Sequence, residues 1–316
     1  MGSVEQKRVA IVGAGHVGAT AAYTLMLRAL CREIVLIDSD PTLAAAEAAD
    51  LSDANALVRP ARIWAGTYED AAAAQIAVLT AGAATHGAES RLSVVSRSAA
   101  IVTSCVDQLI DAGFSGILIV AANPVDLMTL LALRRSRLAA NRVIGTGSLL
   151  DTARLQQTLA IRLGVAPGSI DGLVLGEHGD SEVAAFSTVR VGGLTLDRFC
   201  ATDQDLERLQ IAREVREAGY RIVQGKGYTS FGISTAIVRI CEAILRDEHA
   251  VLPVSTLLTG QYGITDVCLS LPCVLGAIGV ERVLSPDLSA EETRGLLASA
   301  TTLRAALAAA QKPPDR

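Results

Sequence analysis

The first half of the chain alternates short apolar runs with longer stretches rich in alanine and leucine. The short runs predict strands at residues 8–12, 34–37, 76–80, 116–122 and 142–144. The longer stretches predict helices, for example at residues 19–30 and 93–112. Strands that alternate with helices are typical of a parallel sheet covered by helices on both faces. We therefore expect an α/β fold in this half, with a doubly wound parallel sheet.

The pattern changes after Gly147, where strands and helices no longer alternate. Helices are predicted at residues 148–163, 203–224 and 229–246, strands at residues 251–258 and 267–275, and one more helix at the end of the chain. Strands and helices that are segregated in this way indicate an α+β domain. We therefore divide the chain into a first domain at residues 1–145 and a second, substrate-binding domain at residues 146–316.

Composition excludes several classes of protein. Half of the 316 residues are hydrophobic, but only 3% are aromatic and the net charge is −5, which excludes a basic nucleic-acid binder. No apolar run reaches the ~18 residues that a membrane helix needs, and the N-terminus has no hydrophobic signal region. The six cysteines form no CxxC pair. We therefore expect buried thiols, no metal site and a cytoplasmic protein without nucleic-acid or membrane partners.

A glycine-rich turn follows the first predicted strand and opens the first predicted helix. It consists of Gly13, Gly15 and Gly18, with His16 and Val17 between the last two. In this context Gly13 permits the turn, Gly15 lets a pyrophosphate approach the backbone, and Gly18 lets the helix pack on the strand. The N-terminus of the helix supplies amide donors for the phosphates. We therefore expect a Rossmann dinucleotide-binding domain.

Asp38 ends the second predicted strand, twenty residues after Gly18. An acid at this point accepts hydrogen bonds from the ribose hydroxyls of adenosine and repels a 2′-phosphate. We therefore expect NAD rather than NADP as the cofactor. The alternative interpretation is that Asp38 only caps the following turn.

Other polar segments also follow predicted strands. They are the loop at residues 82–91, the dipeptide Asn123-Pro124 and the segment 145–147. Ligands bind beyond the carboxyl ends of the strands in sheets of this kind. We therefore assign these segments to one candidate site at that edge.

The second half contains a polar turn in the sequence LVLGEHGD, residues 173–180, where an apolar strand breaks at Gly176. His178 in this turn has the only side-chain type whose ordinary pKa lets it both give and take a proton near neutral pH. A histidine at a strand end can also be purely structural. Asp151 and Arg154 lie on one face of a predicted helix, where they can equally form an ordinary surface ion pair.

Seven motifs occur in the order that one known family has them: GAGHVG (13–18), Asp38, GAESR (87–91), NPVD (123–126), GTGSLLDTAR (145–154), GEHGD (176–180) and KGYTS (226–230). The chain resembles the lactate/malate dehydrogenase family of NAD-dependent L-2-hydroxyacid dehydrogenases over essentially its full length. Several motifs in one order are far more specific than any one alone. The resemblance implies reversible hydride transfer between NADH and a small-molecule 2-oxo acid.

The resemblance also implies roles for four polar residues. His178 corresponds to the proton donor and acceptor, and Asp151 to the carboxylate that orients its ring. Arg154 corresponds to the arginine that holds the substrate carboxylate with a bidentate fork. Arg91 corresponds to the arginine of the closing loop, which polarises the substrate carbonyl.

Further binding positions follow from the same resemblance. Asn123 and Thr229 correspond to residues that line the nicotinamide and the substrate, although Thr229 is also a candidate helix N-cap. Gly82 and Ile233 are expected to contact the cofactor. The resemblance further implies a homodimer or homotetramer.

Two positions depart from the pattern of the lactate enzymes. Members that prefer lactate typically carry Gln at the position of Thr85, and members that prefer malate carry Arg. Thr85 is shorter than Gln, and Gly219 stands where lactate enzymes usually have Ala. The segments 187–191 and 225–232 look most like L-2-hydroxyisocaproate dehydrogenases. We therefore predict a 2-oxo acid with an apolar side chain larger than that of pyruvate.

Other interpretations stay open. Among enzymes they are L-lactate dehydrogenase and then malate dehydrogenase, which needs His86 or another cation in place of the missing Arg. Gln156 and Asp171 stand where members activated by fructose bisphosphate carry Arg and His, so we predict no activation by a sugar bisphosphate. Outside these enzymes, the chain could be a catalytically idle NAD-binding protein. Reduction of an imine formed from a 2-oxo acid is a further alternative.

Overall fold

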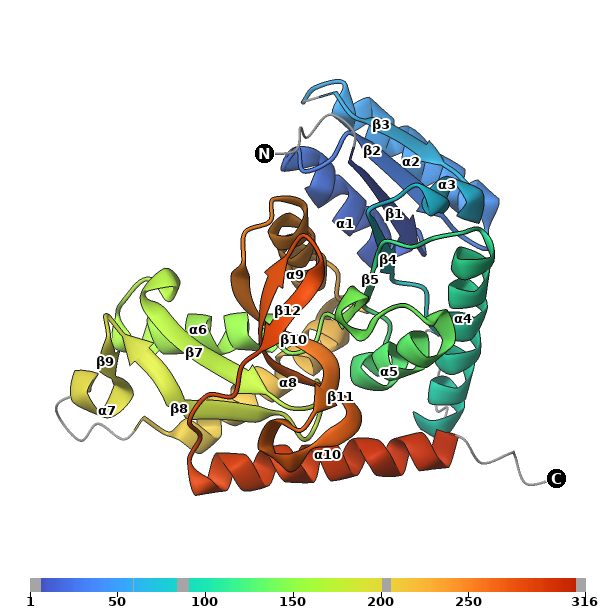
Figure 1. Ribbon diagram of the computed structural model, residues 1–316. Helices are drawn as coiled ribbons and strands as arrows, with labels where there is room; N and C mark the ends of the chain where they lie inside the picture. Colours follow the sequence, from blue (N-terminus) through green and yellow to red (C-terminus); the bar gives the residue numbers. More distant parts are fainter. Residues whose placement is uncertain (1–6, 59, 84–90, 201–205, 311–316) are drawn as a thin grey trace.

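The computed structural model describes residues 7–58, 60–83, 91–200 and 206–310. A large sheet with helices on its faces forms one part of the molecule, and a small sheet lies beside it (Figure 1). In the first half the strands are β1 (Arg8–Val12), β2 (Glu33–Ile37), β3 (Arg62–Ala65), β4 (Ile76–Leu79), β5 (Ile117–Val120) and β6 (Val143–Gly145). The helices are α1 (His16–Leu27), α2 (Pro41–Asn55), α3 (Tyr68–Ala72), α4 (Arg91–Asp111) and α5 (Val125–Ser136).

The strands of the first half pair in parallel in the order β6-β5-β4-β1-β2-β3. Side chains alternate between the two faces, so Ile11 of β1 packs into one core cluster and Val12 into the other. Leu25 of α1 lies in the first cluster and Met128 of α5 in the second. Because both faces are covered, strands such as β4 and β5 are continuous apolar runs. The predicted doubly wound parallel sheet is confirmed.

The edge strand β3 was not predicted from the sequence. Its burial is only partial, with Arg62 and Ala65 exposed and Ile63 and Trp64 half-buried. Arg62 lies over the Trp64 ring, with its Cζ 4.4 Å from the ring centroid. The apolar run of this strand, residues 63–65, is therefore too short for periodicity to detect.

The second half contains both helices and strands. The helices are α6 (Leu149–Leu163), α7 (Leu196–Phe199), α8 (Arg208–Lys226), α9 (Phe231–Leu245) and α10 (Ala290–Ala310). The strands are β7 (Ile170–Leu175), β8 (Val183–Val191), β9 (Leu194–Thr195), β10 (Ala250–Thr259), β11 (Thr265–Gly276) and β12 (Gly279–Val283). The small sheet consists of β7, β8 and β9, and the hairpin between the last two turns at Gly192-Gly193.

The strands β10, β11 and β12 are antiparallel and extend the large sheet beyond β6. The junction is a single pair, Ser255 of β10 opposite Gly145 of β6. The described residues thus form one sheet of nine strands that runs across the proposed division at residue 145. The sequence predicted β10 and β11 but not β12. It also did not predict this junction, because the junction joins segments that are far apart along the chain.

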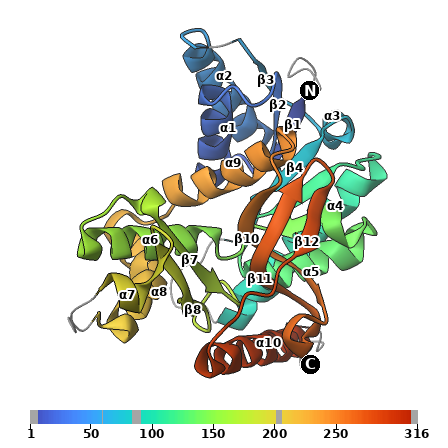
Figure 2. The same cartoon turned by 60° about the vertical axis from the view of Figure 1, so that its left-hand side comes forward.

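Helix α9 links the second half to the first. It packs beside α1 (Figure 2), and the hydroxyl of Ser234 donates a hydrogen bond of 2.8 Å to the carbonyl oxygen of Val17. This contact places the start of α9 next to the glycine-rich turn. Among the described residues, no helix is both long and apolar enough to cross a membrane.

Candidate active site

The glycine-rich turn between β1 and α1 requires glycine at two positions. Gly13 has a φ of +107°, a conformation that side chains disfavour. A Cβ at Gly18 would lie 1.8 Å from the carbonyl oxygen of Gly13, so α1 can approach β1 only with glycine there. A Cβ at Gly15 would meet nothing within 4 Å. The backbone at Gly15 is therefore open to a ligand at the N-terminus of α1.

Asp38 follows β2 and lies against the glycine-rich turn. Its Oδ2 accepts a hydrogen bond of 2.7 Å from the backbone N–H of Ala14. Its Oδ1 accepts one of 2.9 Å from the backbone N–H of Asp40. Asp38 thus caps the following turn, as the alternative interpretation held, and it also faces the turn at which a dinucleotide would bind. The side chain that caps α2 is Asp40.

The junction between α8 and α9 reaches the same turn. The His16 ring stacks on Tyr228, with 3.9 Å between ring centroids. Val17 and Ile233 are half-buried and pack against the same core cluster. Thr229 is half-buried, but the N-cap residue of α9 is Ser230, so the interpretation of Thr229 as the cap is wrong. The ring contact of His16 and the hydrogen bond of Ser234 to Val17 place the start of α9 beside the glycine-rich turn.

Two further predicted residues follow the neighbouring strands. Gly82 comes after β4, and a Cβ there would lie 3.5 Å from the Cβ of Ala122. Asn123 comes after β5 and is exposed. Both lie at the carboxyl edge of the parallel sheet, where the sequence predicts the site.

The turn that carries His178 begins where β7 ends. Gly176 has a φ of +87° and forms a bridge to Ser270 of β11. The backbone N–H of His178 donates a hydrogen bond of 2.8 Å to Oδ2 of Asp126 on α5. The backbone of the turn that carries His178 is thus attached both to β11 of the large sheet and to α5, although it follows a strand of the small sheet.

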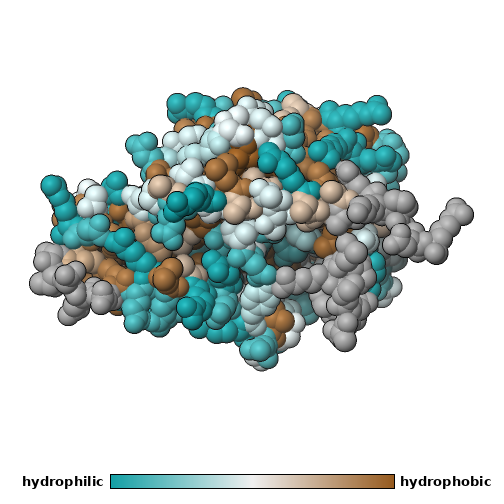
Figure 3. All heavy atoms as spheres, turned by 90° about the horizontal axis from the view of Figure 1, so that it is seen from below, coloured by the Kyte–Doolittle hydropathy of each residue, from teal (hydrophilic) through white to brown (hydrophobic). Residues whose placement is uncertain are grey.

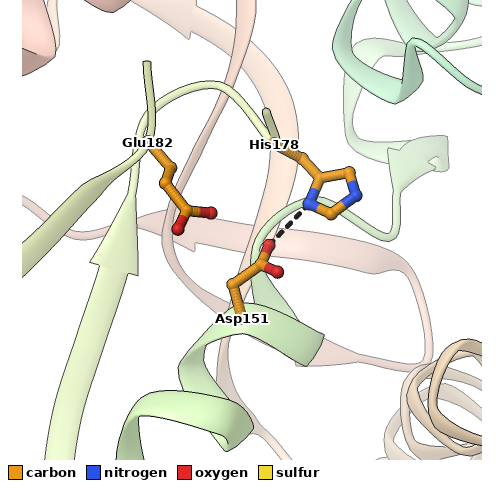
Figure 4. A group of neighbouring side chains, drawn as sticks. All are labelled: Asp151, His178 and Glu182. Carbon is orange, nitrogen blue, oxygen red and sulfur yellow. Dashed lines mark hydrogen bonds and ion pairs between the residues drawn. The ribbon is translucent and has the colours of Figure 1, made fainter. Parts of the chain in front are cut away.

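His178, Asp151 and Arg154 form one hydrogen-bonded chain. Nδ1 of His178 lies 2.5 Å from Oδ2 of Asp151 (Figure 4). Nη1 of Arg154 donates a hydrogen bond of 2.9 Å to Oδ1 of Asp151. The Asp151 side chain is 2% exposed and that of Arg154 is 18% exposed, so the pair is not the solvated ion pair that its spacing allows. Nε2 of His178 points away from Asp151.

These contacts change the proton affinities of both partners. Burial lowers the pKa of His178, but the charge and hydrogen bond of Asp151 outweigh it, and Asp126 and Glu182 add to the same direction. The net effect raises the pKa of His178 from 6.5 to about 9. Burial raises the pKa of Asp151, but His178 and Arg154 hold it below its ordinary value. At neutral pH His178 is therefore an imidazolium, and its charge is stabilised by the carboxylate of Asp151.

The sequence did not single out two carboxyl groups at this site. Asp126 is 2% exposed, and burial raises its pKa to about 6 against the opposing influence of Ser255 and His178. Glu182 is 6% exposed and directs its carboxyl group toward Asp151 and His178 (Figure 4). Asp126 lies in the NPVD motif, which was a usable signal. Glu182 gave no signal, because an acid one residue before a strand usually lies in solvent.

Of the two residues that the sequence analysis links to substrate choice, Gly219 lies among the described residues and Thr85 does not. Gly219 lies on α8, and a Cβ there would lie 3.8 Å from Nη2 and 3.9 Å from Nη1 of Arg154. Thr85 lies outside the described residues, as does His86. Arg91 is the first residue of α4, and only its backbone position is described.

Comparison with known proteins identifies the same family in both halves of the chain. The model of the lactate/malate dehydrogenase NAD binding domain matches residues 7–145, and that of the lactate/malate dehydrogenase alpha/beta C-terminal domain matches residues 148–312. An L-lactate dehydrogenase of Thermus aquaticus is 43% identical over 307 residues, which are 96% of this chain and 99% of the relative. One of Acetivibrio thermocellus is 40% identical over 302 residues, which are 94% of this chain and 95% of the relative.

Solved structures agree with this assignment. The minor L-lactate dehydrogenase of Enterococcus mundtii, in its ligands-bound form, has a TM-score of 0.93 and 38% identity, and the match covers 96% of this chain and 98% of that one. A lactate dehydrogenase from a Medee basin deep-sea metagenome library has a TM-score of 0.94 and 36% identity, with coverage of 98% and 100%. The chain belongs to the lactate/malate dehydrogenase family and is an NAD-dependent oxidoreductase that acts on 2-hydroxy acids.

Proposed function

We propose that this enzyme reduces a 2-oxo acid to the L-2-hydroxy acid with His178 as the proton donor. When bound, NADH supplies the hydride. The free backbone at Gly15 and the position of Asp38 fit the pyrophosphate and the adenosine ribose of this cofactor. His178 gives the proton from Nε2 to the carbonyl oxygen, while Asp151 holds Nδ1 and stabilises the imidazolium. The reverse reaction begins with neutral His178.

Arg154 is proposed to hold the carboxylate of the substrate. Its guanidinium has one nitrogen committed to Asp151, and a guanidinium has donors left to form a bidentate pair with a second carboxylate. Arg91 is proposed to polarise the carbonyl, and Asn123 and Thr229 to line the nicotinamide and the substrate. These four assignments follow the family resemblance.

We further propose that the preferred substrate has an apolar side chain larger than the methyl group of pyruvate. The observation that carries this proposal is the space at Gly219. A Cβ there would be in van der Waals contact with the guanidinium of Arg154. Because no side chain occupies this space, a substrate held by Arg154 has more room beside it. Each additional buried methylene contributes about 0.8 kcal/mol, so discrimination against pyruvate should be moderate.

L-lactate dehydrogenase is the second candidate, because the relatives of Thermus aquaticus and Acetivibrio thermocellus bear that name. In that case pyruvate is the preferred 2-oxo acid. Malate dehydrogenase ranks lower, since Thr85 offers no charge to pair with the second carboxylate of oxaloacetate, and an unpaired buried charge costs several kcal/mol.

The deciding experiment measures kcat/KM for NADH oxidation with pyruvate, oxaloacetate, 2-oxoisocaproate and phenylpyruvate. The wild-type enzyme is expected to favour the two bulky acids. Gly219→Ala adds a methyl group that fits the protein without a clash, and it should shift the preference toward pyruvate. A wild-type preference for pyruvate, unchanged in Gly219→Ala, would identify a lactate dehydrogenase instead.

We also propose a cytoplasmic location, assembly into a homodimer or homotetramer, and a division into domains at residue 145. Activation by a sugar bisphosphate is not expected. Gln156 donates a hydrogen bond of 3.4 Å to the carbonyl oxygen of Gly172, and Asp171 adds a negative charge nearby. Adding fructose bisphosphate at low substrate concentration should therefore leave the rate unchanged.

A further inference from the structure

Glu182 is a buried carboxyl group that the reaction described above does not use. It lies between the His178 turn and β8, where its backbone N–H donates a hydrogen bond of 3.2 Å to the carbonyl oxygen of Gly179. The residue is 6% exposed. Its Oε1 has no hydrogen-bond partner among the described residues. A buried oxygen without a partner is costly for stability, so its presence calls for a functional reason.

The surroundings of Glu182 point to the catalytic pair. One nitrogen of His178 and one oxygen each of Asp151 and Glu182 lie within 4.8 Å of one another. Figure 4 shows the Glu182 carboxyl on the side of the imidazole where Nδ1 lies, away from the open Nε2. Glu182 therefore lies on the Nδ1 side of His178. It does not occupy the space at Nε2, where the carbonyl group of the substrate is proposed to bind.

We propose that Glu182 is a positioning residue whose carboxyl group makes protonation of His178 more favourable and so sets the pH range in which the 2-oxo acid is reduced. A negative charge within ~4–6 Å of an imidazole stabilises its charged form. Glu182 contributes in this direction together with Asp151 and Asp126, and the three groups act on the same imidazole from three different segments. This inference rests on the proposed role of His178 as proton donor.

Some of the charged groups around Glu182 raise its pKa and others lower it. Burial and the charge of Asp151 raise the pKa of Glu182 to about 8, although His178, Arg216 and Arg154 oppose them. Arg216 of α8 donates its hydrogen bond of 3.4 Å to the backbone carbonyl oxygen of Glu182 and not to the carboxyl group. Glu182 therefore gains its charge over the same alkaline range in which His178 loses its proton.

Replacing Glu182 by Gln removes this charge and keeps the shape of the side chain. We expect the alkaline decline of kcat/KM for 2-oxo acid reduction to move to lower pH by about one unit, the lower end of the effect of a neighbouring charge. The acidic rise of kcat/KM for 2-hydroxy acid oxidation should move in the same direction, since that reaction needs neutral His178. A loss of packing alone would lower both rates without moving either profile.

The experiment combines these pH profiles with a direct titration of His178. Histidine ring carbons are labelled with ¹³C, and the His178 signal is assigned by its absence in His178→Gln; the chain has only four histidines. In Glu182→Gln the midpoint of His178 should fall by about one pH unit. Glu182→Asp should lower it less, because it keeps the charge but withdraws it from the pair. Glu291→Gln, an exposed position on α10, is the matched control and should change nothing.

An unchanged His178 midpoint in Glu182→Gln, or in Glu182→Asp if the first variant does not fold, overturns the inference. The proposed function is tested separately. It fails if His178→Gln still turns over 2-oxo acids, whatever the titration of the Glu182 variants shows.

Discussion

At the scale of single residues, the proposed proton donor is a histidine whose protonated form is stabilised by its neighbours. Nδ1 of His178 is only 2.5 Å from a buried oxygen of Asp151, and its backbone N–H is fixed by Asp126. An isolated imidazole would be half-neutral near its ordinary pKa of 6.5. Here the neighbouring carboxylates raise the pKa of His178 to about 9, so it is protonated at neutral pH, which is the form that its proposed role as proton donor requires.

The first prediction concerns pH. Because the pKa of His178 is raised to about 9, kcat/KM for reduction should be constant near neutral pH and decline as the pH rises through that value. Asp151→Asn removes the charge that outweighs burial, so the decline should begin at lower pH and kcat/KM should fall roughly 10²- to 10⁴-fold. Initial rates from pH 6 to about 10 test both points. A profile of Asp151→Asn that keeps the wild-type midpoint would contradict the assignment.

The second prediction concerns Arg154. Lysine keeps the charge but has no fork to bind Asp151 and a substrate carboxylate together. Loss of a charge-assisted hydrogen bond costs about 1.5–3 kcal/mol, so KM for the 2-oxo acid should rise roughly 10- to 150-fold in Arg154→Lys. Arg162→Lys on the same helix is the control, since Arg162 forms an ion pair with Glu214 of α8. Equal effects of the two substitutions would argue against a substrate contact of Arg154.

At the scale of elements, two glycines of the turn between β1 and α1 differ in the reason for which glycine is needed. Gly18 is needed for packing, because a Cβ would collide with the carbonyl oxygen of Gly13. Gly15 is not needed for packing, because a Cβ there would meet no protein atom within 4 Å. The space at Gly15 is therefore open to the ligand that the proposed function places there.

The third prediction uses this pair of glycines as matched variants. Gly18→Ala should lower the free energy of unfolding by about 1–3 kcal/mol, as overpacking does, and it should weaken NADH binding as well. Gly15→Ala should leave unfolding by urea nearly unchanged and still weaken NADH binding, measured by fluorescence titration. If Gly15→Ala bound NADH as tightly as the wild type, the pyrophosphate would have to lie elsewhere.

At the scale of the whole molecule, α8 carries a group of exposed apolar side chains near its C-terminal end. In the single chain Tyr220 is 55% exposed, Ile222 42% and Val223 47%. The side of the molecule that carries α10 instead shows hydrophobic residues scattered among hydrophilic ones (Figure 3). A cluster of exposed apolar side chains on one helix favours a contact with a second subunit.

The fourth prediction is that the enzyme is a homo-oligomer in which α8 is covered. Val223→Glu should lower the molar mass measured by light scattering after size exclusion, because a charge at an apolar interface is unfavourable. Leu297→Glu on α10, which is 42% exposed, is the control and should leave the mass unchanged. A monomeric wild type would contradict this prediction.

The sequence by itself determined the parallel sheet, the nucleotide turn and the candidate catalytic residues. Apolar runs and glycine spacing are local properties of the sequence, so they can be recognised without knowledge of the tertiary structure. The order of the motifs added the family. His178, Asp151 and Arg154 could be named because their residue types and motifs carry the signal, although the sequence alone did not show that they touch.

Only the tertiary structure decided how distant segments meet. β10 pairs with β6, and the turn that carries His178 is hydrogen-bonded to Asp126. Asp151 is buried, so its ion pair with Arg154 is shielded from solvent. The tertiary structure also placed Glu182 next to His178 and Asp151, which no local pattern could indicate. Proton affinity depends on burial and on charges a few ångströms away. Those distances arise only when α5, α6 and the turn after β7 pack together.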